Sequence, residues 1–446
     1  MMSPLFGPIR KLMLLNYDAS APALFTVLPE LVDVHRRAGL DSPLQYHLGG
    51  FGFCLEEAIM KALGETVERS SQVTFPSSSR HLLKRHSHDE LASLGIRHLP
   101  IHELGRFSDE QMTGEGFFRK IPKDHPIWWV PGIDLRNDQD TLVPLQAVIV
   151  GFTSRDELRS TLAVTTGTAA HTGYGKALSG AVRELLQIDA TVGHWYSNSK
   201  APRIEMSSSS TPRLARLFER YRDWLSRSGV QIEFYWLKQP EELPIFVVAC
   251  AVRRPGGYPS LSFGLGADAD LEAAMYSALC EAIPVSVIAL INAVEQLYGP
   301  QKDNGAMPQR LHADLQTAYS RLDLKKLMNF DHAVGYWALP ENAAKLFPAR
   351  FDSDAVLGGP DIRRQVASLP AGNGDAGIEL IRATLEHHRL FMFDLTAPDT
   401  EALGFKVVRL FSPDLLALCA PSYPEAAHPR FAAFGGFRSF DPHPYP

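Results

Sequence analysis

The chain has 446 residues, of which 45% are hydrophobic and 21% charged, an ordinary composition for a globular protein with a large core. Its formal charge of −6 and pI near 6.2 give no electrostatic basis for binding nucleic acid. The four cysteines lie in apolar runs without metal-binding spacing. This pattern is typical of reduced, buried thiols. No apolar run reaches the length of a membrane span, and no signal peptide is evident. We therefore expect a cytoplasmic enzyme or binding module that is independent of membranes.

The first half of the chain predicts alternating helices and strands. A helix is expected from Leu55 to about Gln72, followed by a polar surface loop over 77–95 that leads into a second helix. Two strands are expected around a polar turn at 137–140. The Ser-rich stretch 197–213 is expected to be an exposed connection.

The second half continues this alternation. An amphipathic helix is expected to stop at Gly229, and strands are expected at 230–238 and 244–252. Asp270 is the expected N-cap of a further helix, which Pro284 is expected to kink or end about one turn past Ala278. Beyond it we expect a strand at 329–338, a loop at 348–361, a helix at 377–389, and strands at 391–396 and 405–411. This order predicts an α/β or α+β protein with several antiparallel strands.

Three stretches repeat one pattern, a glycine-rich turn followed by Ala-x-x-x-Ala-x-x-Glu on an expected helix. Positions i, i+4 and i+7 lie on one helix face, so two small residues and one carboxylate look the same way in each copy. The aligned residues are Ala58, Ala62 and Glu65, then Ala177, Ala181 and Glu184, then Ala274, Ala278 and Glu281.

Small residues let helices approach closely, which would bring the three glutamates towards a common centre. Such a cluster is unfavourable unless cations neutralise it, so the repeat indicates Mg²⁺ and phosphates. The alternative is that each glutamate is simply solvated on an amphipathic helix. The sequence has no Walker A, GxGxxG, GxSxG or HExxH motif, so ATP binding would not use the common phosphate loop.

Further motifs follow in order along the chain and accompany the repeats. They are E-x-x-E-R at 65–69, Gly-Thr-Ala-Ala at 167–170, E-L-x-x-x-D-A at 184–190 followed by Trp195, A-L-x-E-A at 278–282, Asp331-His332, Asp394-Leu395-Thr396 with Pro398-Asp399, and a P-x-P-x-P ending. This ordered set resembles the YcaO family over essentially the whole chain. The ending resembles the azoline-forming members, of the D-protein type. Its alternative interpretation is a disordered Pro-rich tail or an SH3-type ligand.

The resemblance implies a single YcaO-like domain over 1–446 with a Pro-rich tail at 440–446, and an ATP- and Mg²⁺-dependent peptide cyclodehydratase. In this reaction a Cys, Ser or Thr side chain attacks the preceding amide carbonyl. The amide oxygen receives the γ-phosphoryl group of ATP and leaves as phosphate, giving a thiazoline or oxazoline. Thioamide or amidine formation is an alternative within the family, because the same amide activation would serve another nucleophile.

The resemblance also implies roles for particular residues. Metal ligands would be Glu65, Glu184, Gln187 and Glu281. Glu68 and Arg69 would contact the nucleotide, with Arg10 or Lys11 as further candidates. The tail prolines Pro442, Pro444 and Pro446 would act at the catalytic centre.

Partners are implied as well. The substrate would be a ribosomal precursor peptide of the kind that yields bacteriocins. A separate leader-binding protein of the E1-like, ocin-ThiF type would assist, together with a flavin dehydrogenase in some systems. We expect a homodimer within such a complex.

The sequence departs from the family pattern at a few positions. Gln187 and Ile188 stand where Glu-Arg is common, and Pro284 and Ser286 replace the usual Gln and Arg. Each lost charge-assisted hydrogen bond to phosphate would cost about 1.5–3 kcal/mol. The chain is therefore either a divergent active cyclodehydratase or a catalytically degenerate subunit that scaffolds a complex or presents peptide to a partner enzyme.

The tail carries its own expectation. Residues 440–446 offer few apolar contacts, so an ordered tail would point to function. We expect it near the glutamates, where the Pro446 carboxylate would orient the substrate or accept a proton. Deleting Tyr445 and Pro446 is expected to leave folding intact.

Overall fold

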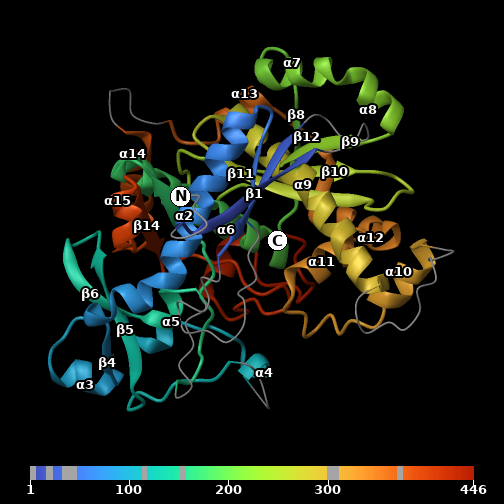
Figure 1. Ribbon diagram of the computed structural model, residues 1–446. Helices are drawn as coiled ribbons and strands as arrows, with labels where there is room; N and C mark the ends of the chain where they lie inside the picture. Colours follow the sequence, from blue (N-terminus) through green and yellow to red (C-terminus); the bar gives the residue numbers. More distant parts are fainter. Residues whose placement is uncertain are drawn as a thin grey trace.

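The structure is a computed structural model that describes residues 7–16, 24–32, 48–112, 118–150, 157–298, 311–368 and 375–445. Its described strands form three sheets (Figure 1). The first sheet has the order β1 (Ile9–Asn16), β2 (Phe25–Leu31), β3 (Gly50–Gly52). The second sheet has the order β11 (Leu261–Asp268), β10 (Phe246–Arg253), β9 (Gln231–Trp236), β8 (Ala201–Glu205), β12 (Phe351–Gly358). The third sheet has the order β4 (Lys84–His86), β5 (Ile127–Asp134), β13 (Phe391–Asp394), β14 (Lys406–Phe411), β7 (Thr168–His171), and β6 (Gln139–Pro144) pairs with β5. Only β12 and β8 pair in parallel among these described strands. The expected mixed, largely antiparallel architecture is confirmed.

Three long helices, α2 (Leu55–Ser78), α6 (Tyr174–Tyr196) and α9 (Leu271–Tyr298), run through the middle of the molecule (Figure 1). The shorter helices surround them. They are α3 (His88–Ser93), α4 (Asp109–Met112), α5 (Leu145–Val148), α7 (Pro212–Arg220), α8 (Arg222–Ser228), α10 (Leu311–Tyr319), α11 (Phe330–Trp337), α12 (Pro340–Arg350), α13 (Gly359–Arg363), α14 (Ala376–His387) and α15 (Pro398–Ala402), with 3₁₀ turns at Arg80–Leu82, Ile101–Glu103 and Pro429–Phe434.

The second sheet is buried on both faces because β10 alternates its side chains between two apolar clusters. Val247 and Ala249 face the cluster that contains Trp195 of α6. Val248 and Cys250 face the cluster formed with α9. The near-continuous apolar sequence of β10 therefore reflects its central position, and the sheet holds α6 and α9 on opposite sides.

By length and composition, residues 271–297 of α9 would suffice to cross a membrane, although more than half of this apolar segment is buried in the protein. It packs closely on β11 and β10 and then on α10 and α11. We therefore interpret α9 as a core helix.

Several sequence-based expectations are wrong. The helix starting at Leu55 continues to Ser78, and α9 does not end near Pro284 but continues to Tyr298. Beyond the proline, Val285 and Ala289 pack against α11, and this tertiary packing outweighs the missing proline N–H.

Residues 329–338 contain helix α11 instead of a strand, because the Asn329 side chain caps it by accepting the His332 N–H at 3.0 Å. The expected loop at 348–361 contains β12, whose exposed, Asp-containing sequence is typical of an edge strand. The Ser-rich connection contains β8.

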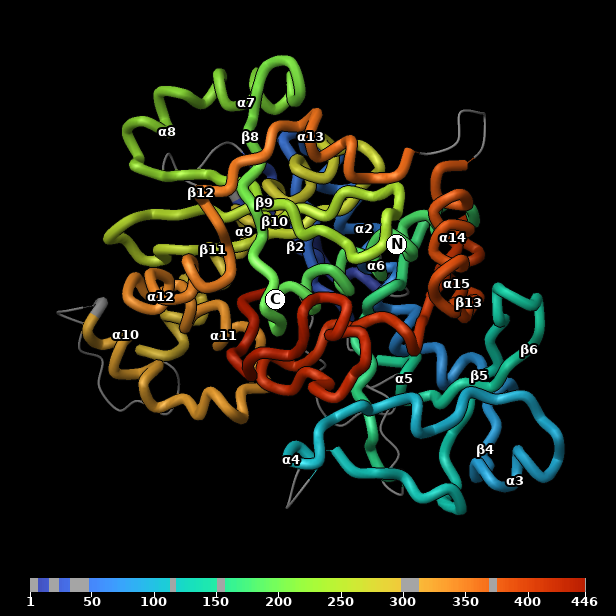
Figure 2. Tube along the Cα trace, turned by 180° about the vertical axis from the view of Figure 1, so that it is seen from behind, coloured from blue at the N-terminus to red at the C-terminus, as the bar shows by residue number. Residues whose placement is uncertain are grey.

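A buried ion-pair cluster fixes α6 to the C-terminal segment, which lies over the face of the molecule seen in Figure 2. Arg430 donates to both carboxylate oxygens of Asp189, with its shortest contact at 2.6 Å, and also to Glu241. Asp189 is fully buried and also accepts the Leu416 N–H at 2.9 Å. The Asp of the D-A motif therefore has a structural role.

Replacing Asp189 with Ala is expected to destabilise the protein by about 3–5 kcal/mol, because Arg430 would lose its fully buried partner. Denaturant unfolding of the variant measures this loss. An unchanged unfolding midpoint would show that the cluster does not hold the C-terminal segment in place.

Candidate active site

The three sequence repeats fold into three strand–helix units, β3–α2, β7–α6 and β11–α9. In two of them a strand glycine lies directly on the helix backbone. A Cβ atom on Gly50 would lie 1.7 Å from the Ala58 oxygen, and one on Gly266 would lie 2.1 Å from the Ala274 oxygen. Glycine and alanine are therefore needed together, because any larger residue would push the helix off the strand.

The same two units hold their glutamates in the same way. Gly49 N–H donates to Glu65 Oε2 at 3.0 Å, and Leu265 N–H donates to Glu281 Oε2 at 3.1 Å. In each unit the donor precedes the carboxylate by 16 residues. At the equivalent position of the third unit, Thr168 donates its N–H to the Thr165 carbonyl at 2.9 Å. The repeat therefore reflects a shared strand-to-glutamate contact in two of the three units.

The glutamates of the three helices lie close enough to alter one another's ionisation. The pKa of Glu184 is raised to about 7, mainly by burial, which Arg69 and Arg409 oppose and to which Glu65 and Glu281 add. Burial, with Glu184 and Glu65 adding to it, also holds the pKa of Glu68 well above its usual range. The predicted convergence of Glu65, Glu184 and Glu281 is therefore seen in their electrostatics.

Burial likewise raises the pKa of Glu281 to about 7, with Glu65 adding to the rise and the Leu265 N–H and Lys61 opposing it. The Glu281 side chain nevertheless reaches solvent. Water therefore screens the charge of Glu281. Glu184 is only partly exposed, so its raised pKa is the better evidence that the carboxylates interact.

Two arginines balance this negative charge. Arg69 on α2 contacts Glu65 at 3.3 Å and Glu68 at 3.9 Å. Arg409 on β14 is almost fully buried, and Glu184 and Glu68 act on its pKa, which burial lowers to about 10. It donates to the carbonyls of Val164 at 2.6 Å and Ala147 at 3.4 Å.

The Nε atoms of Arg69 and Arg409 are buried and make no hydrogen bond to the described protein. Sequence reasoning missed Arg409, although a lone arginine within the apolar strand 405–411 was an available signal. Such unused buried donors suit phosphate oxygens.

The carboxylate groups also suit a divalent cation, because carboxylate oxygens are ligands that Mg²⁺ prefers and a cation would relieve the repulsion between neighbouring carboxylates. Across the described residues, no three Asp, Glu, His or Cys side chains form a ready-made metal-binding group. Glu65, Glu184 and Glu281, with the half-buried Gln187 on α6, are the oxygen donors that would hold Mg²⁺.

Other candidate residues lie elsewhere. Arg10 and Lys11 are exposed on β1 and pair with Glu30 at 3.3 and 2.8 Å. Ile188 is buried in the apolar cluster that contains Trp195. The Ser286 hydroxyl donates to the Ile283 carbonyl of its own helix at 2.6 Å. Neither Ile188 nor Ser286 replaces the missing guanidinium.

The C-terminal tail is buried, so the expectation of few apolar contacts is wrong. Trp195 donates its indole N–H to the Asp441 carbonyl at 2.9 Å, and Trp337 donates to the Pro442 carbonyl at 2.6 Å. Pro444 is buried, and Tyr445 is 2% exposed. Deleting Tyr445 would therefore remove core. Pro446 lies outside the described residues.

The end of the tail approaches the strand that holds Glu281. The Tyr445 ring lies 5.9 Å from the ring of Phe263 on β11. Phe263 comes two residues before Leu265, whose N–H binds Glu281. The tail and the carboxylate cluster thus share one strand.

The fold and these residues define a class of α/β proteins in which repeated strand–helix units gather carboxylates and arginines where a cation and phosphates fit. The family model "YcaO cyclodehydratase, ATP- and Mg²⁺-binding" matches residues 49–416. The chain belongs to this family of enzymes, and ATP and Mg²⁺ are its cofactors.

Solved structures share the fold at low sequence identity. A heterocyclase in complex with substrate and cofactor has a TM-score of 0.70 at 17% identity, covering 100% of this chain and 55% of that one. YcaO from Methanopyrus kandleri, bound with AMPPCP and Mg²⁺, has a TM-score of 0.58 at 15% identity, covering 98% and 91%. The E. coli microcin synthetase McbBCD complex with pro-MccB17 bound has a TM-score of 0.53 at 14% identity, covering 91% and 88%.

The chain spans about half the length of two of the heterocyclases it resembles, the second being TruD, of which it covers 45%. Curated proteins gave no sequence match.

Replacing Glu184 with Gln is expected to stabilise the ligand-free protein at pH 8 and to leave it nearly unchanged at pH 5. The folded pKa of about 7 lies above the ordinary glutamate pKa of 4.5, so the folded state holds this proton more tightly than the unfolded state. The stabilisation from the protonated group is fully present below about pH 4.5 and is lost as pH rises to 7. Glutamine does not ionise, so the Glu184→Gln variant keeps this stabilisation at pH 8.

Denaturant unfolding at both pH values measures the effect. Glu272→Gln is the matched control, because Glu272 pairs with Arg213 at 2.9 Å and accepts the Leu214 N–H at 2.7 Å, so its loss should destabilise at pH 8. A Glu184→Gln variant that is also less stable at pH 8 would contradict the crowded-carboxylate account.

Proposed function

We propose that this chain catalyses ATP-dependent cyclodehydration of Cys, Ser or Thr residues in a ribosomal precursor peptide to thiazoline or oxazoline. The observation that carries the proposal is the cluster in which glutamates of three repeated units meet Arg69 and Arg409. Membership in the family supports it. The substrate, partners and cytoplasmic location are part of the proposal.

We assign one set of residues to the metal ion and another to the nucleotide. Glu65, Glu184, Gln187 and Glu281 would hold Mg²⁺ by oxygen ligands. Glu68 and Arg69 would contact the nucleotide.

Arg409 would add a buried donor on the β14 side, through the Nε atom that no described group satisfies. This donor would offset part of the charge lost at Ile188. Arg10 and Lys11, paired with Glu30, are not retained in the nucleotide site.

When bound, ATP supplies the phosphoryl group that converts the amide oxygen into a leaving group, and Mg²⁺ neutralises phosphate charge. The peptide thiol or hydroxyl forms a bond to the preceding carbonyl carbon. The carbon–oxygen bond of that amide then breaks with release of phosphate, so the peptide loses one water in total. Pro442 and Pro444 would hold the tail rigidly beside this reaction, because the two tryptophan hydrogen bonds fix its backbone.

A partner would deliver the peptide. This proposal is supported by two heterocyclases that are about twice as long as this chain and by the multi-protein complex that contains pro-MccB17. An E1-like, ocin-ThiF-type leader-binding protein fits this need, with a flavin dehydrogenase acting on the azolines. We propose a homodimer within such a complex.

The main test combines ATP hydrolysis with mass spectrometry of a precursor peptide in the presence of the partner. Wild type is expected to hydrolyse ATP and to remove 18 Da per ring, the mass of one water. Glu65→Gln and Glu184→Gln are expected to lower the rate at least about 100-fold, because each removes a charged ligand from the site. Glu30→Gln, which affects only the β1–β2 pair, should retain the wild-type rate.

The opposite result would favour the degenerate subunit. In that case the wild-type chain would neither hydrolyse ATP nor gain thermal stability with Mg-ATP, even though its partner assembled with it. The departures at Ile188 and Ser286 would then have removed nucleotide binding.

Loosening the tail is expected to lower both stability and activity. Trp337→Phe removes the donor to the Pro442 carbonyl and should cost about 1–3 kcal/mol, because that buried carbonyl is left unsatisfied. We expect cyclisation to fall at least about tenfold, because the tail is no longer held in position.

Tyr258→Phe is the control, because it removes a hydrogen bond of 3.1 Å to the Ala289 carbonyl that does not involve the tail. Unfolding midpoints and product formation are measured for both variants. Equal activity in both would show that the tail only completes the core.

A further inference from the structure

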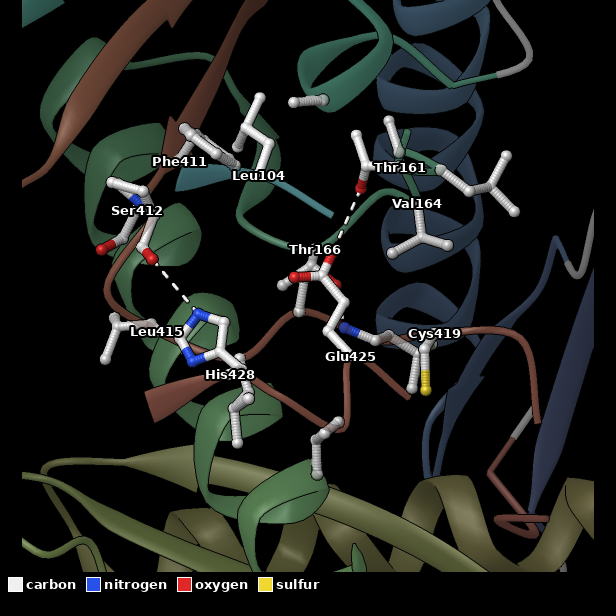
Figure 3. A pocket seen from close by; sticks show the side chains of 18 of the residues that line it. Leu104, Thr161, Val164, Thr166, Phe411, Ser412, Leu415, Cys419, Glu425 and His428 are labelled. Carbon is white, nitrogen blue, oxygen red and sulfur yellow. Dashed lines mark hydrogen bonds between the residues drawn. The ribbon is translucent and has the colours of Figure 1, made fainter. Parts of the chain in front are cut away.

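The structure contains a cavity of about 70 Å³, and Figure 3 shows side chains that line it. It is enclosed by the end of β14, the segment 161–166, helix α6 and the segment 412–428. Most of its walls are apolar, including Leu104, Val164, Phe411 and Leu415. Such walls exclude charged groups, because an unpaired charge would lose its hydration there.

The cavity connects the two features to which the proposed function assigns roles. Arg409 lines it and interacts electrostatically with Glu184 and Glu68. Cys419 also lines it, and the Cys419 carbonyl contacts His443 Nε2 of the tail at 2.8 Å. A group in the cavity would therefore lie between the phosphate-binding residues and the tail.

One carboxylate with unused hydrogen-bonding capacity projects among these walls. Glu425 accepts the Thr161 hydroxyl at 3.3 Å and the Arg106 N–H at 3.1 Å, whereas a carboxylate offers about four acceptor positions. Burial raises the pKa of Glu425.

His428 is different, because both its ring nitrogens have partners. Nε2 contacts the Pro413 carbonyl at 3.2 Å and Nδ1 accepts the Arg430 N–H at 3.1 Å. Glu425 is therefore better placed than His428 to accept a hydrogen bond from a bound group.

The size of the cavity narrows the choice of ligand. A cavity of about 150 Å³ holds benzene, so 70 Å³ is too small for a purine base or an aromatic side chain. It suits a side chain of a few heavy atoms. Its lining also carries polar groups, among them Thr166, Ser412 and Glu425, so a short uncharged side chain that ends in a thiol or hydroxyl fits it.

We propose that this cavity receives the Cys, Ser or Thr side chain of the substrate peptide, with Glu425 accepting a hydrogen bond from its thiol or hydroxyl. This inference rests on the proposed function and makes the cavity its specificity pocket. Ala163 and Val164 would set its size, since both line it. A larger residue at Ala163 should reject Thr, which has one more methyl group than Ser.

The test uses the full chain and four small probes, the N-acetyl N-methylamides of Cys, Ser, Thr and Phe, titrated by NMR. The Cys, Ser and Thr probes are expected to bind and the Phe probe is not. Ala163→Val should weaken the Thr probe at least about tenfold more than the Ser probe, the usual effect of one methyl group in a closed pocket. Val164→Ala should shift the ratio the other way.

Two further variants test whether the Glu425 carboxylate contributes to binding and whether a change of side-chain size outside the cavity has any effect. Glu425→Leu should weaken the Cys and Ser probes about tenfold, as expected for one hydrogen bond. Ala383→Val is the size-matched control, because Ala383 lies on α14 and does not line the cavity, and it should leave every ratio unchanged. Thermal melting checks that each variant is folded.

The failure of this inference differs from the failure of the proposed function. If ATP-dependent water loss occurs but the probes do not bind, or Phe binds as well as Ser, or Ala163→Val changes all ratios equally, the cavity is not the specificity pocket. If the probes follow the size rule but no water loss occurs with the partner present, the cavity binds these side chains and the proposed reaction is wrong.

Discussion

The close approach of a strand to the helix that follows it is the constraint on which the site depends. Gly50 and Gly266 bring their strands onto the backbones of α2 and α9. At that separation, a backbone N–H of the incoming strand reaches the glutamate on the second turn beyond, as Gly49 does for Glu65 and Leu265 for Glu281. Small residues in the sequence are therefore responsible for the placement of charged ones.

This arrangement concentrates negative charge, and the structure offsets it only in part. Arg69 and Arg409 oppose the rise in the pKa of Glu184, which still reaches about 7. A protein selected only for stability would replace or pair such carboxylates. These carboxylates lie beside two buried arginine Nε atoms that have no hydrogen-bond partners among the described residues. Together they are typical of a site that binds a cation and an anion.

Much of this was predictable because local sequence carries it. The repeat of Ala, Ala and Glu follows helix geometry, and the glutamates on the three helices were identified from it. The strand over 405–411 was also identified, but the role of Arg409 depends on the carbonyls of Ala147 in α5 and of Val164, which are distant in sequence. Likewise, Asp189 could not be recognised as structural without knowing that Arg430 folds back onto α6.

The errors have a common cause, since tertiary contacts outweigh local preference. Asn329 caps a helix in a segment rich in strand-forming residues, and α9 continues through Pro284 because its second half is packed. The tail was expected to make few apolar contacts, yet Tyr445 is buried and Trp195 and Trp337 bind the tail carbonyls. The sequence of the tail does not indicate that tryptophans far away in the chain will bind it.

We propose that glutamates from three strand–helix units form one metal and nucleotide site. A structure determined with a non-hydrolysable ATP analogue and Mg²⁺ tests it most directly. The account predicts metal density within about 2.0–2.1 Å of oxygen atoms from Glu65, Glu184 and Glu281, with the triphosphate against Arg69 and Arg409. Metal bound by residues of only one unit, or a nucleotide elsewhere on the protein, would contradict it.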